Sequence, residues 1–462
     1  MSRDTKYTKQ FDFIPIIMDR REFLKISAAA AATSALSACG NDSAQRSVLP
    51  GASSESGTMT MRHNPNSGDD VSILGYGCMR WPQKKDEEGK DVLDQDGINA
   101  LVDYALAHGV NYFDTAPVYC QGKSERATGI ALARHPRSSY FIATKLSNFG
   151  DTSRETALAL YHNSLSELQT DYIDYYLLHS IGDGGDGFNH RFVDNGMIDF
   201  LQEERRAGRI RNLGFSFHGG KEGFEQLMAL HEQYHWDFCQ IQMNYIDWRL
   251  AGCPAEYLYE ELAKRSIPVV IMEPLLGGRL SKVPDNIVAR LKGRDPEHSV
   301  ASWAFRFAGT PEGVLTVLSG MTYMEHLQDN VSTYSPLRPL TDDDNRFLYE
   351  TAELIQKYPL IPCNDCKYCM PCPYGIDIPS VLLYYNRRVT EQALPTDSGS
   401  PEYRKLRRAF LDGYDKAVPS LRQADHCIGC RTCVAECPQH IDIPAQLQRI
   451  DEYIEKLKQE KL

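Results

Sequence analysis

The sequence lacks a basic surplus, a long apolar run and a glycine-rich phosphate turn, and each absence argues against a class of protein. Its 62 acidic residues outnumber 50 basic ones, and a net charge of −12 does not suit a nucleic-acid partner. No apolar run approaches the length needed to span a bilayer. No Gly-x-Gly-x-x-Gly turn follows the first expected strand, which disfavours an open dinucleotide-binding sheet. The 462 residues suit two or three globular domains.

Cysteine is abundant, and eight of the thirteen cysteines form two runs near the C-terminus. The runs are Cys363-x-x-Cys366-x-x-Cys369-x-x-Cys372-Pro373 and Cys427-x-x-Cys430-x-x-Cys433-x-x-x-Cys437-Pro438. The second run has the spacing of bacterial ferredoxins, in which the fourth cysteine ligates the other cluster. The first run is one residue shorter before its fourth cysteine. The spacing predicts two [4Fe–4S] clusters, held by Cys363, Cys366, Cys369 and Cys437 and by Cys427, Cys430, Cys433 and Cys372.

Zinc is the alternative reading of these cysteines. Zinc sites also use Cys-x-x-Cys pairs, but a longer loop usually separates the two pairs. Four cysteines in one run, closed by Cys-Pro and occurring twice, therefore favour clusters. The remaining cysteines are scattered and suggest no disulfide pairing: Cys39, Cys78, Cys120, Cys239 and Cys253.

The N-terminal residues 1–39 indicate an export signal rather than structure. Arg20-Arg21-Glu22-Phe23-Leu24-Lys25 resembles the twin-arginine motif, and Leu36-Ser37-Ala38-Cys39 resembles a lipoprotein cleavage site with Cys39 as the lipidated residue. Met18 is an alternative start, and a plain disordered tail is the competing interpretation. Residues 40–58 are rich in small polar residues and are expected to form a flexible tether. We expect a periplasmic or cell-envelope protein that is anchored to a membrane surface by lipid.

Short apolar runs alternate with amphipathic stretches of helical length between residues 59 and 340. The apolar runs are Val71–Gly75, Val110–Asp114, Tyr140–Lys145, Tyr172–His179, Asn212–Ser216, Phe238–Met243, Pro268–Met272 and Val314–Ser319. Eight such units predict an α/β fold, a (β/α)8 TIM barrel. A linking helix (341–357), a small, mostly α ferredoxin-like domain (358–450) and a tail (451–462) are expected to follow. In the small domain we expect the clusters, rather than an apolar core, to hold the chain together.

Four reactive side chains stand at or near the ends of successive strands of this barrel. Asp114, Lys145 and His179 end the second, third and fourth expected strands, and Tyr119 lies in the loop after Asp114. Active sites of such barrels gather at the carboxyl ends of the strands, and a charged group buried there is costly unless it is paired or used. One such residue would more often be structural, but four at successive strands favour a catalytic site.

Two stretches of the chain resemble the aldo-keto reductase superfamily. They are Gly109–Ala116 with Tyr119 and Ser124-Glu125, and Leu168–Asp174 with Leu178-His179. With the cysteine runs, the chain resembles the ferredoxin-fused branch. The resemblance implies carbonyl reduction with NAD or NADP, in which Tyr119 donates the proton. Lys145 is then expected to lower the pKa of Tyr119, Asp114 to keep Lys145 charged, and His179 to orient the carbonyl.

The same resemblance implies a set of nucleotide-binding residues. They are Ser216 and Gln240 for the nicotinamide, Met272, Pro274, Leu275 and Gly277 along the pyrophosphate, and Gly320, Met321 and Asn330 around the adenosine phosphate. The chain departs from the family pattern at Phe217, at Met272 and at His326, where the family commonly has asparagine, tyrosine and arginine.

These observations predict an oxidoreductase that couples carbonyl and alcohol interconversion to two iron–sulfur clusters. Its expected partners are a small carbonyl or alcohol substrate and a redox protein or quinone-linked acceptor, with no nucleic acid. Clusters pass single electrons while a nicotinamide passes a hydride, and the sequence does not identify the step between them. The alternative is a non-catalytic, nucleotide-binding protein for electron transfer or redox sensing.

Overall fold

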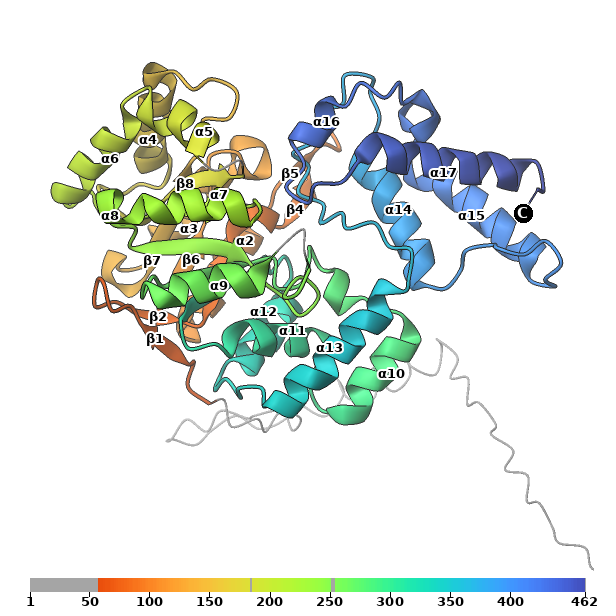
Figure 1. Ribbon diagram of the computed structural model, residues 1–462, viewed down its shortest axis with the longest axis horizontal. Helices are drawn as coiled ribbons and strands as arrows, with labels where there is room; N and C mark the ends of the chain where they lie inside the picture. Colours follow the sequence, from red (N-terminus) through yellow and green to blue (C-terminus); the bar gives the residue numbers. More distant parts are fainter. Residues whose placement is uncertain (1–56, 183–184, 251–253, 462) are drawn as a thin grey trace, which may run out of the picture. The chain divides into compact units, whose positions relative to one another are not determined.

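A computed structural model describes residues 57–182, 185–250 and 254–461. Within these residues, eight parallel strands close into a barrel in chain order (Figure 1), which confirms the predicted fold. The strands are β3 (Leu74–Gly77), β6 (Tyr112–Asp114), β7 (Phe141–Leu146), β8 (Ile173–Ile181), β9 (Ile210–Phe217), β10 (Phe238–Gln242), β11 (Val269–Met272) and β12 (Val314–Ser319). Cys39 and the signal segment lie outside the described residues.

Helices cover the outside of the strand ring. They are α2 (Gln95–Ala107), α3 (Ser124–Leu132), α4 (Arg154–Glu167), α6 (Met197–Arg206), α7 (Lys221–Ala229), α9 (Ala255–Lys264), α10 (Asp285–Arg294), α11 (Val300–Gly309) and α12 (Met324–Thr333). Because both faces of the barrel are covered, its strands are buried almost throughout, and β8 is buried at eight of its nine positions.

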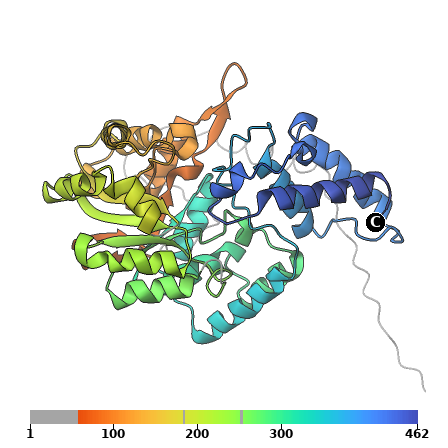
Figure 2. The same cartoon turned by 45° about the horizontal axis from the view of Figure 1, so that its top comes forward.

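The first expected strand is divided between two sheets. Residues Asp70–Ser72 form β2, which pairs antiparallel with β1 (Met61–His63), and the barrel strand β3 begins only at Leu74. The Ser72 hydroxyl donates to the carbonyl of Leu74 (2.7 Å) and fixes the bend between the two strands. A second hairpin, β4 (Gln83–Lys85) with β5 (Asp91–Leu93), extends beyond the barrel as the orange-red ribbon in Figure 2.

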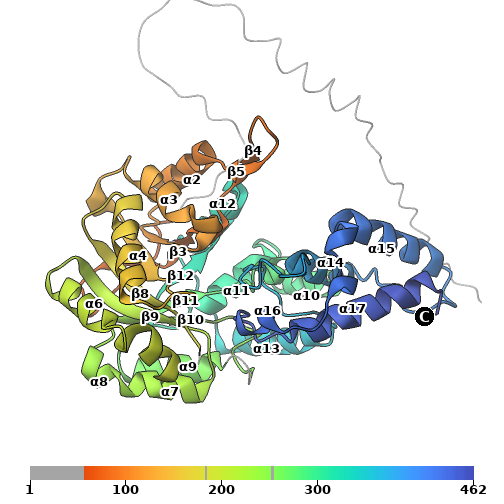
Figure 3. The same ribbon diagram turned by 90° about the horizontal axis from the view of Figure 1, so that it is seen from above.

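The C-terminal region is helical. After α13 (Asp342–Gln356), which Thr341 caps, the chain forms α14 (Ile378–Thr390), α15 (Tyr403–Ala417), α16 (Thr432–Ala435) and α17 (Ile443–Lys458). Helices α14, α15 and α17 pack together (Figure 3). Among the described residues, no helix is long and apolar enough to cross a membrane.

The expectation that this region lacks an apolar core was wrong. Residues of α14, α15 and α17 form a buried cluster that includes Leu382, Phe410 and Leu447. The predicted tail from residue 451 is also absent, because α17 continues to Lys458 and buries Ile454 and Leu457. These side chains recur at helical spacing, so burial against α14 and α15 stabilises the helix. The domain therefore has an apolar core in addition to its cysteines.

The two halves of this domain repeat a short pattern. Each Cys-Pro pair is followed two residues later by Ile-Asp-Ile-Pro, once at residues 376–379 and once at 441–444. Asp377 accepts the backbone N–H of Ser380 to cap α14, and Asp442 accepts that of Ala445 to cap α17. The repeat sets each fourth cysteine ahead of a capped helix in the same way.

Candidate active site and cluster ligands

The four predicted catalytic residues converge at the carboxyl end of the barrel. Lys145 Nζ donates to Asp114 Oδ1 (2.6 Å) and to the carbonyl of Thr115 (2.8 Å). The ammonium lies 5.0 Å from the ring centroid of Tyr119, and the rings of Tyr119 and His179 are 5.9 Å apart. All four side chains are buried. The strand ends and the loop after β6 therefore assemble one polar centre inside an apolar surrounding.

The Asp114–Lys145 pair is an internal ion pair. Burial raises the pKa of Asp114 and lowers the pKa of Lys145, and the contact between the two groups opposes both shifts. Asp114 Oδ2 is buried and has no hydrogen-bond partner. Removal of either partner would leave a buried charge without compensation, which costs about 3–5 kcal/mol. The pair holds the lysine ammonium in place beneath the tyrosine ring.

The pKa of Tyr119 is shifted upward, whereas the sequence analysis expected it to be lowered. Burial raises it well above the ordinary value, and the nearby acidic groups of Tyr368, Asp114 and Glu273 raise it further. The expectation of a lowered pKa was wrong for the free site, because burial dominates and the Lys145 ammonium is already paired with Asp114. Tyr119 therefore keeps its proton at neutral pH, which suits a proton donor.

His179 is held as a neutral ring. Burial lowers its pKa well below the ordinary value, and Lys145, Arg191 and His218 lower it further. The hydroxyl of Ser147 lies 2.6 Å from His179 Nδ1. In the tautomer in which Ser147 donates to Nδ1, Nε2 carries the proton and can donate to a carbonyl oxygen. Sequence reasoning missed Ser147, whose only signal is its position two residues after Lys145.

The predicted nicotinamide-binding residues are neighbours on β9 and β10. Ser216 and Gln240 are paired across the two strands. Ser216 Oγ accepts the backbone N–H of Ser180 (2.7 Å), while Gln240 Oε1 is buried without a partner. A buried acceptor without a donor costs free energy. An amide donor placed here would relieve that cost, so this end of the site fits a nicotinamide carboxamide.

The segment predicted to follow the pyrophosphate is covered by the first cysteine run. A Cβ atom on Gly277 would lie 2.4 Å from the carbonyl oxygen of Asn364. The Asn364 amide donates to Glu273 Oε1 (2.8 Å), and Arg80 donates to the Asn364 carbonyl (2.7 Å). A pyrophosphate along Gly277 and the loop in this position exclude each other. At this end the residues do not fit the nucleotide while the loop is docked.

The remaining predicted nucleotide residues follow β12. Asn330 donates to the hydroxyl of Ser319 (2.9 Å), and the carbonyl of Met321 accepts the hydroxyl of Tyr76. Gly320 packs against Arg80, the residue that also binds the cysteine loop. Met272, Pro274 and Leu275 lie between β11 and Gly277. The arrangement gathers the predicted residues along one rim of the barrel, under the loop.

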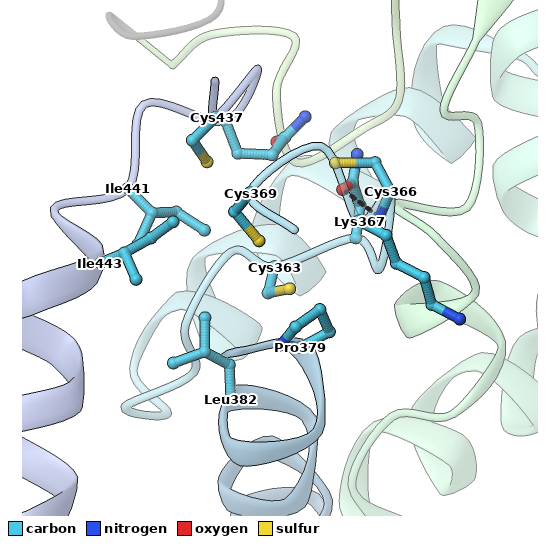
Figure 4. A pocket seen from close by; sticks show the side chains of 11 residues that line it. Cys363, Cys366, Lys367, Cys369, Pro379, Leu382, Cys437, Ile441 and Ile443 are labelled. Carbon is cyan, nitrogen blue, oxygen red and sulfur yellow. Dashed lines mark hydrogen bonds between the residues drawn. The ribbon is translucent and has the colours of Figure 1, made fainter. Parts of the chain in front are cut away.

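Cysteines from both runs surround a common space. The thiols of Cys363, Cys366, Cys369 and Cys437 face one another across it, with Ile441 and Ile443 on one side (Figure 4). Lys367 points its ammonium away from this space. Burial, together with the neighbouring thiols of Cys366, Cys363 and Cys437, raises the pKa of Cys369 to about 12. The fourth cysteine of the second run thus stands with three cysteines of the first run.

The other four cysteines also lie close to one another. Burial, together with the neighbouring thiols of Cys430, Cys372 and Cys427, raises the pKa of Cys433 to about 11. No group of three His, Cys, Asp or Glu side chains among the described residues could hold a single metal ion. A cluster places a core of irons and sulfides between its thiolates, so its cysteines stand farther apart than ligands of one ion. Each set supplies four thiols, the number of cysteines that a [4Fe–4S] cluster takes.

Comparisons with known proteins agree with this division of the chain. A profile described as the aldo/keto reductase family matches residues 73–352. Profiles of a 4Fe-4S dicluster domain and of a TAT (twin-arginine translocation) pathway signal sequence match residues 362–443 and 18–37.

Individual relatives match the barrel. An uncharacterized oxidoreductase of Bacillus subtilis, YqkF, is 24% identical over 63% of this chain and 95% of its own length. An aldo-keto reductase of Bacillus halodurans in its holo form is 24% identical, with a TM-score of 0.51 over 63% of this chain and 96% of that one. A Klebsiella pneumoniae aldo-keto reductase solved in complex with NADPH is 21% identical, with a TM-score of 0.50 over 64% and 96%. These likenesses of structure concern the fold.

Proposed function

We propose that the barrel interconverts a carbonyl and an alcohol in concert with two [4Fe–4S] clusters. The premise is that the chain belongs to the aldo/keto reductase family and is an oxidoreductase with a 4Fe-4S domain and a twin-arginine export signal. The observation that carries this proposal is the convergence of Tyr119, His179 and the Asp114–Lys145 pair beside the cysteines of the first run.

Each residue of the barrel centre has a distinct role in the proposed reaction. Tyr119 gives its hydroxyl proton to the carbonyl oxygen as negative charge develops there. His179, with Ser147 on its Nδ1 atom, donates to the same oxygen and orients it. Lys145, held by Asp114, offsets the charge left on Tyr119 after the transfer. The high pKa of Tyr119 keeps the donor protonated in the free site.

A nicotinamide nucleotide, NAD or NADP, is the proposed hydride carrier. Ser216 and Gln240 would hold its carboxamide, and a bound nicotinamide supplies or accepts the hydride. Glu273 and Asn364 stand where the pyrophosphate is expected, and His326 replaces the arginine that commonly binds a 2′-phosphate. We therefore propose that full binding of the nucleotide requires the cysteine loop to leave Gly277.

The cluster domain is proposed to connect the barrel to a one-electron partner. Its two cysteine sets would hold clusters that accept and release single electrons. The proposed partner is a redox protein or a quinone-linked acceptor. After export, cleavage before Cys39 and lipidation of that residue would leave the protein at a membrane surface in the periplasm or cell envelope.

The direct test uses anaerobically purified protein that lacks residues 1–39. We expect a broad visible band near 400 nm with about eight irons and eight sulfides per chain. The same protein should oxidise NADPH or NADH when aromatic or aliphatic carbonyl compounds are added. A colourless protein that contains zinc would overturn the cluster proposal, and a loaded protein inert toward every carbonyl compound would overturn the barrel chemistry.

Replacing Gly277 by alanine should weaken docking of the cysteine loop. The new methyl group would collide with Asn364, and we expect NADPH to bind about tenfold more tightly because more of the protein is open. Fluorescence titration of NADPH measures the change. Gly278→Ala is the matched control: Gly277 and Gly278 both have positive φ (+67° and +98°), but a Cβ on Gly278 meets nothing within 4 Å. Equal NADPH affinity in both variants and in wild type would show that the loop does not compete.

A further inference from the structure

The first cysteine run is anchored to the rim of the barrel at Asn364. This residue lies between two cysteines of the run and is buried. Its amide donates to Glu273 (2.8 Å), and its carbonyl accepts from Arg80 (2.7 Å), whose guanidinium also lies 3.6 Å from Asp365. Because Glu273 directly follows β11, these bonds hold the cysteine loop over the carboxyl end of the barrel.

The loop after the second cysteine run is anchored to the same rim. Gln439 Nε2 donates to Gln242 Oε1 (2.8 Å), and Gln242 Nε2 donates back to Gln439 Oε1 (3.3 Å). His440 Nε2 donates to the carbonyl of His218 (3.0 Å). Gln242 ends β10, and His218 directly follows β9. Cys437, whose thiol stands with those of the first run, is therefore tied to the barrel by contacts of its own loop.

Tyr368 extends from the first run into the catalytic centre. Its ring lies 6.5 Å from the ring of His179 and 6.3 Å from that of Phe149, and it forms a hydrogen bond with Tyr119. A cavity of about 1100 Å³ beside it is lined by Tyr119 and Tyr368 but not by His179. Tyr368 therefore separates His179 from this cavity and occupies the hydrogen bond that Tyr119 would form with a carbonyl oxygen.

The other cysteine set has no comparable contacts. Residues 427–433 carry three of its thiols, and within the described part of the chain they form no hydrogen bond with the barrel. The bonds of this segment stay inside the cluster domain, as where Arg431 donates to Asp442 (3.2 Å). Cys430 is exposed. Of the two sets, the first therefore joins the cluster domain to the barrel.

We propose that residues 363–369 and 437–441 form a two-part lid over the barrel, and that the first cluster holds the two parts together. In the closed lid, Tyr368 takes the place of the carbonyl compound and Asn364 takes that of the pyrophosphate. A cluster bonded to thiols of both parts makes their contacts with the barrel act jointly. Without it each part leaves the rim separately, and more of the protein is open to a nucleotide. The proposal concerns access to the site and requires no turnover.

Hydrogen–deuterium exchange of residues 273–278 tests the lid in the full-length holoprotein. This barrel segment lies under Asn364, and its backbone N–H groups bond within the segment, so its exchange reports how often the cover is removed. We expect Cys437→Ser, which removes the first cluster, to speed this exchange about tenfold. Cys430→Ser is the matched control, because it removes the second cluster and should leave the exchange as in wild type.

Tyr368→Ala tests the lid while both clusters stay in place. Loss of the ring contacts with His179 and Phe149 should speed exchange of residues 273–278 about tenfold and tighten NADPH binding, measured by fluorescence titration, about tenfold. Tyr374→Ala is the matched control, because Tyr374 also lies two residues after a cysteine of these runs but does not line the cavity. Iron per chain is measured, and only tyrosine variants with wild-type iron are compared.

Each part of the proposal has an outcome that contradicts it. Exchange of residues 273–278 at the same rate in wild type, Cys437→Ser and Tyr368→Ala would rule out the lid. Equal acceleration by Cys437→Ser and Cys430→Ser would show that the first cluster has no special part in holding it. Faster exchange without tighter NADPH binding would show that the lid does not cover the nucleotide site. Failure of the proposed function is distinct, since it abolishes carbonyl turnover and leaves the exchange differences between variants in place.

Discussion

Tyr119→Phe is expected to lower the rate of carbonyl reduction by about 1000-fold while leaving the iron content and the reduction of the clusters unchanged. The phenyl ring keeps the packing against His179 but removes the proton donor, and a positioned proton donor contributes a factor of about 10²–10⁴. Steady-state kinetics with NADPH and an aryl ketone measure the first quantity. Anaerobic titration of the visible band with dithionite measures the second.

Tyr245→Phe is the control for this substitution. The hydroxyl of Tyr245 is also buried, makes no hydrogen bond and lies outside the catalytic centre, so its loss should leave turnover within about twofold of wild type. If Tyr119→Phe instead retains the wild-type rate, Tyr119 is not the donor. If wild type shows no turnover and both variants reduce their clusters equally, the non-catalytic electron-transfer alternative is favoured.

Cys437→Ser is expected to remove the cluster held by the first cysteine run, although Cys437 belongs to the second run. The iron content should fall from about eight to about four per chain, because each cluster needs four cysteines. The structure places the Cys437 thiol with those of Cys363, Cys366 and Cys369, whereas Cys372 lies near Cys433.

Double substitutions separate the crossed arrangement from two independent runs. Cys363→Ser with Cys437→Ser should leave about four irons, since both changes affect one cluster, whereas independent runs would lose both clusters. Cys363→Ser with Cys372→Ser is the converse pair and should leave almost no iron. Cys239→Ser, at a buried thiol of the barrel, should keep all eight. About four irons in the converse pair and none in the first would contradict the crossed assignment.

Local patterns in the sequence were sufficient to predict the barrel fold and the residues of its polar centre. Strand ends bring their side chains to one rim, so the spacing of Asp114, Lys145 and His179 already implies their proximity. The pKa of Tyr119 was predicted in the wrong direction, because it depends on burial and on acidic groups of distant segments. The helical spacing of apolar residues from Leu447 to Leu457 was visible in the sequence. It was not used to predict α17, because the clusters were expected to hold this domain together.

Contacts between the two domains could not be predicted in this way. Asn364 on Gly277, Arg80 on Asn364 and Tyr368 beside His179 join segments that lie far apart along the chain. No periodicity or motif in the sequence predicts these contacts, because each of the side chains is also compatible with a solvent-exposed loop. The structure was needed to show that the cysteine loop forms part of the barrel's mouth.

The position of Cys437 has a consequence for the order of biosynthesis. If the first cysteine run depends on Cys437, that run remains without its fourth ligand until the ribosome has translated beyond residue 437. By then the barrel, the linking helix α13 and most of the cluster domain have already been made. The signal at residues 18–37 emerges first, yet the twin-arginine route carries folded proteins. If the first cluster forms before export, departure from the cytoplasm waits until residue 437 has been translated.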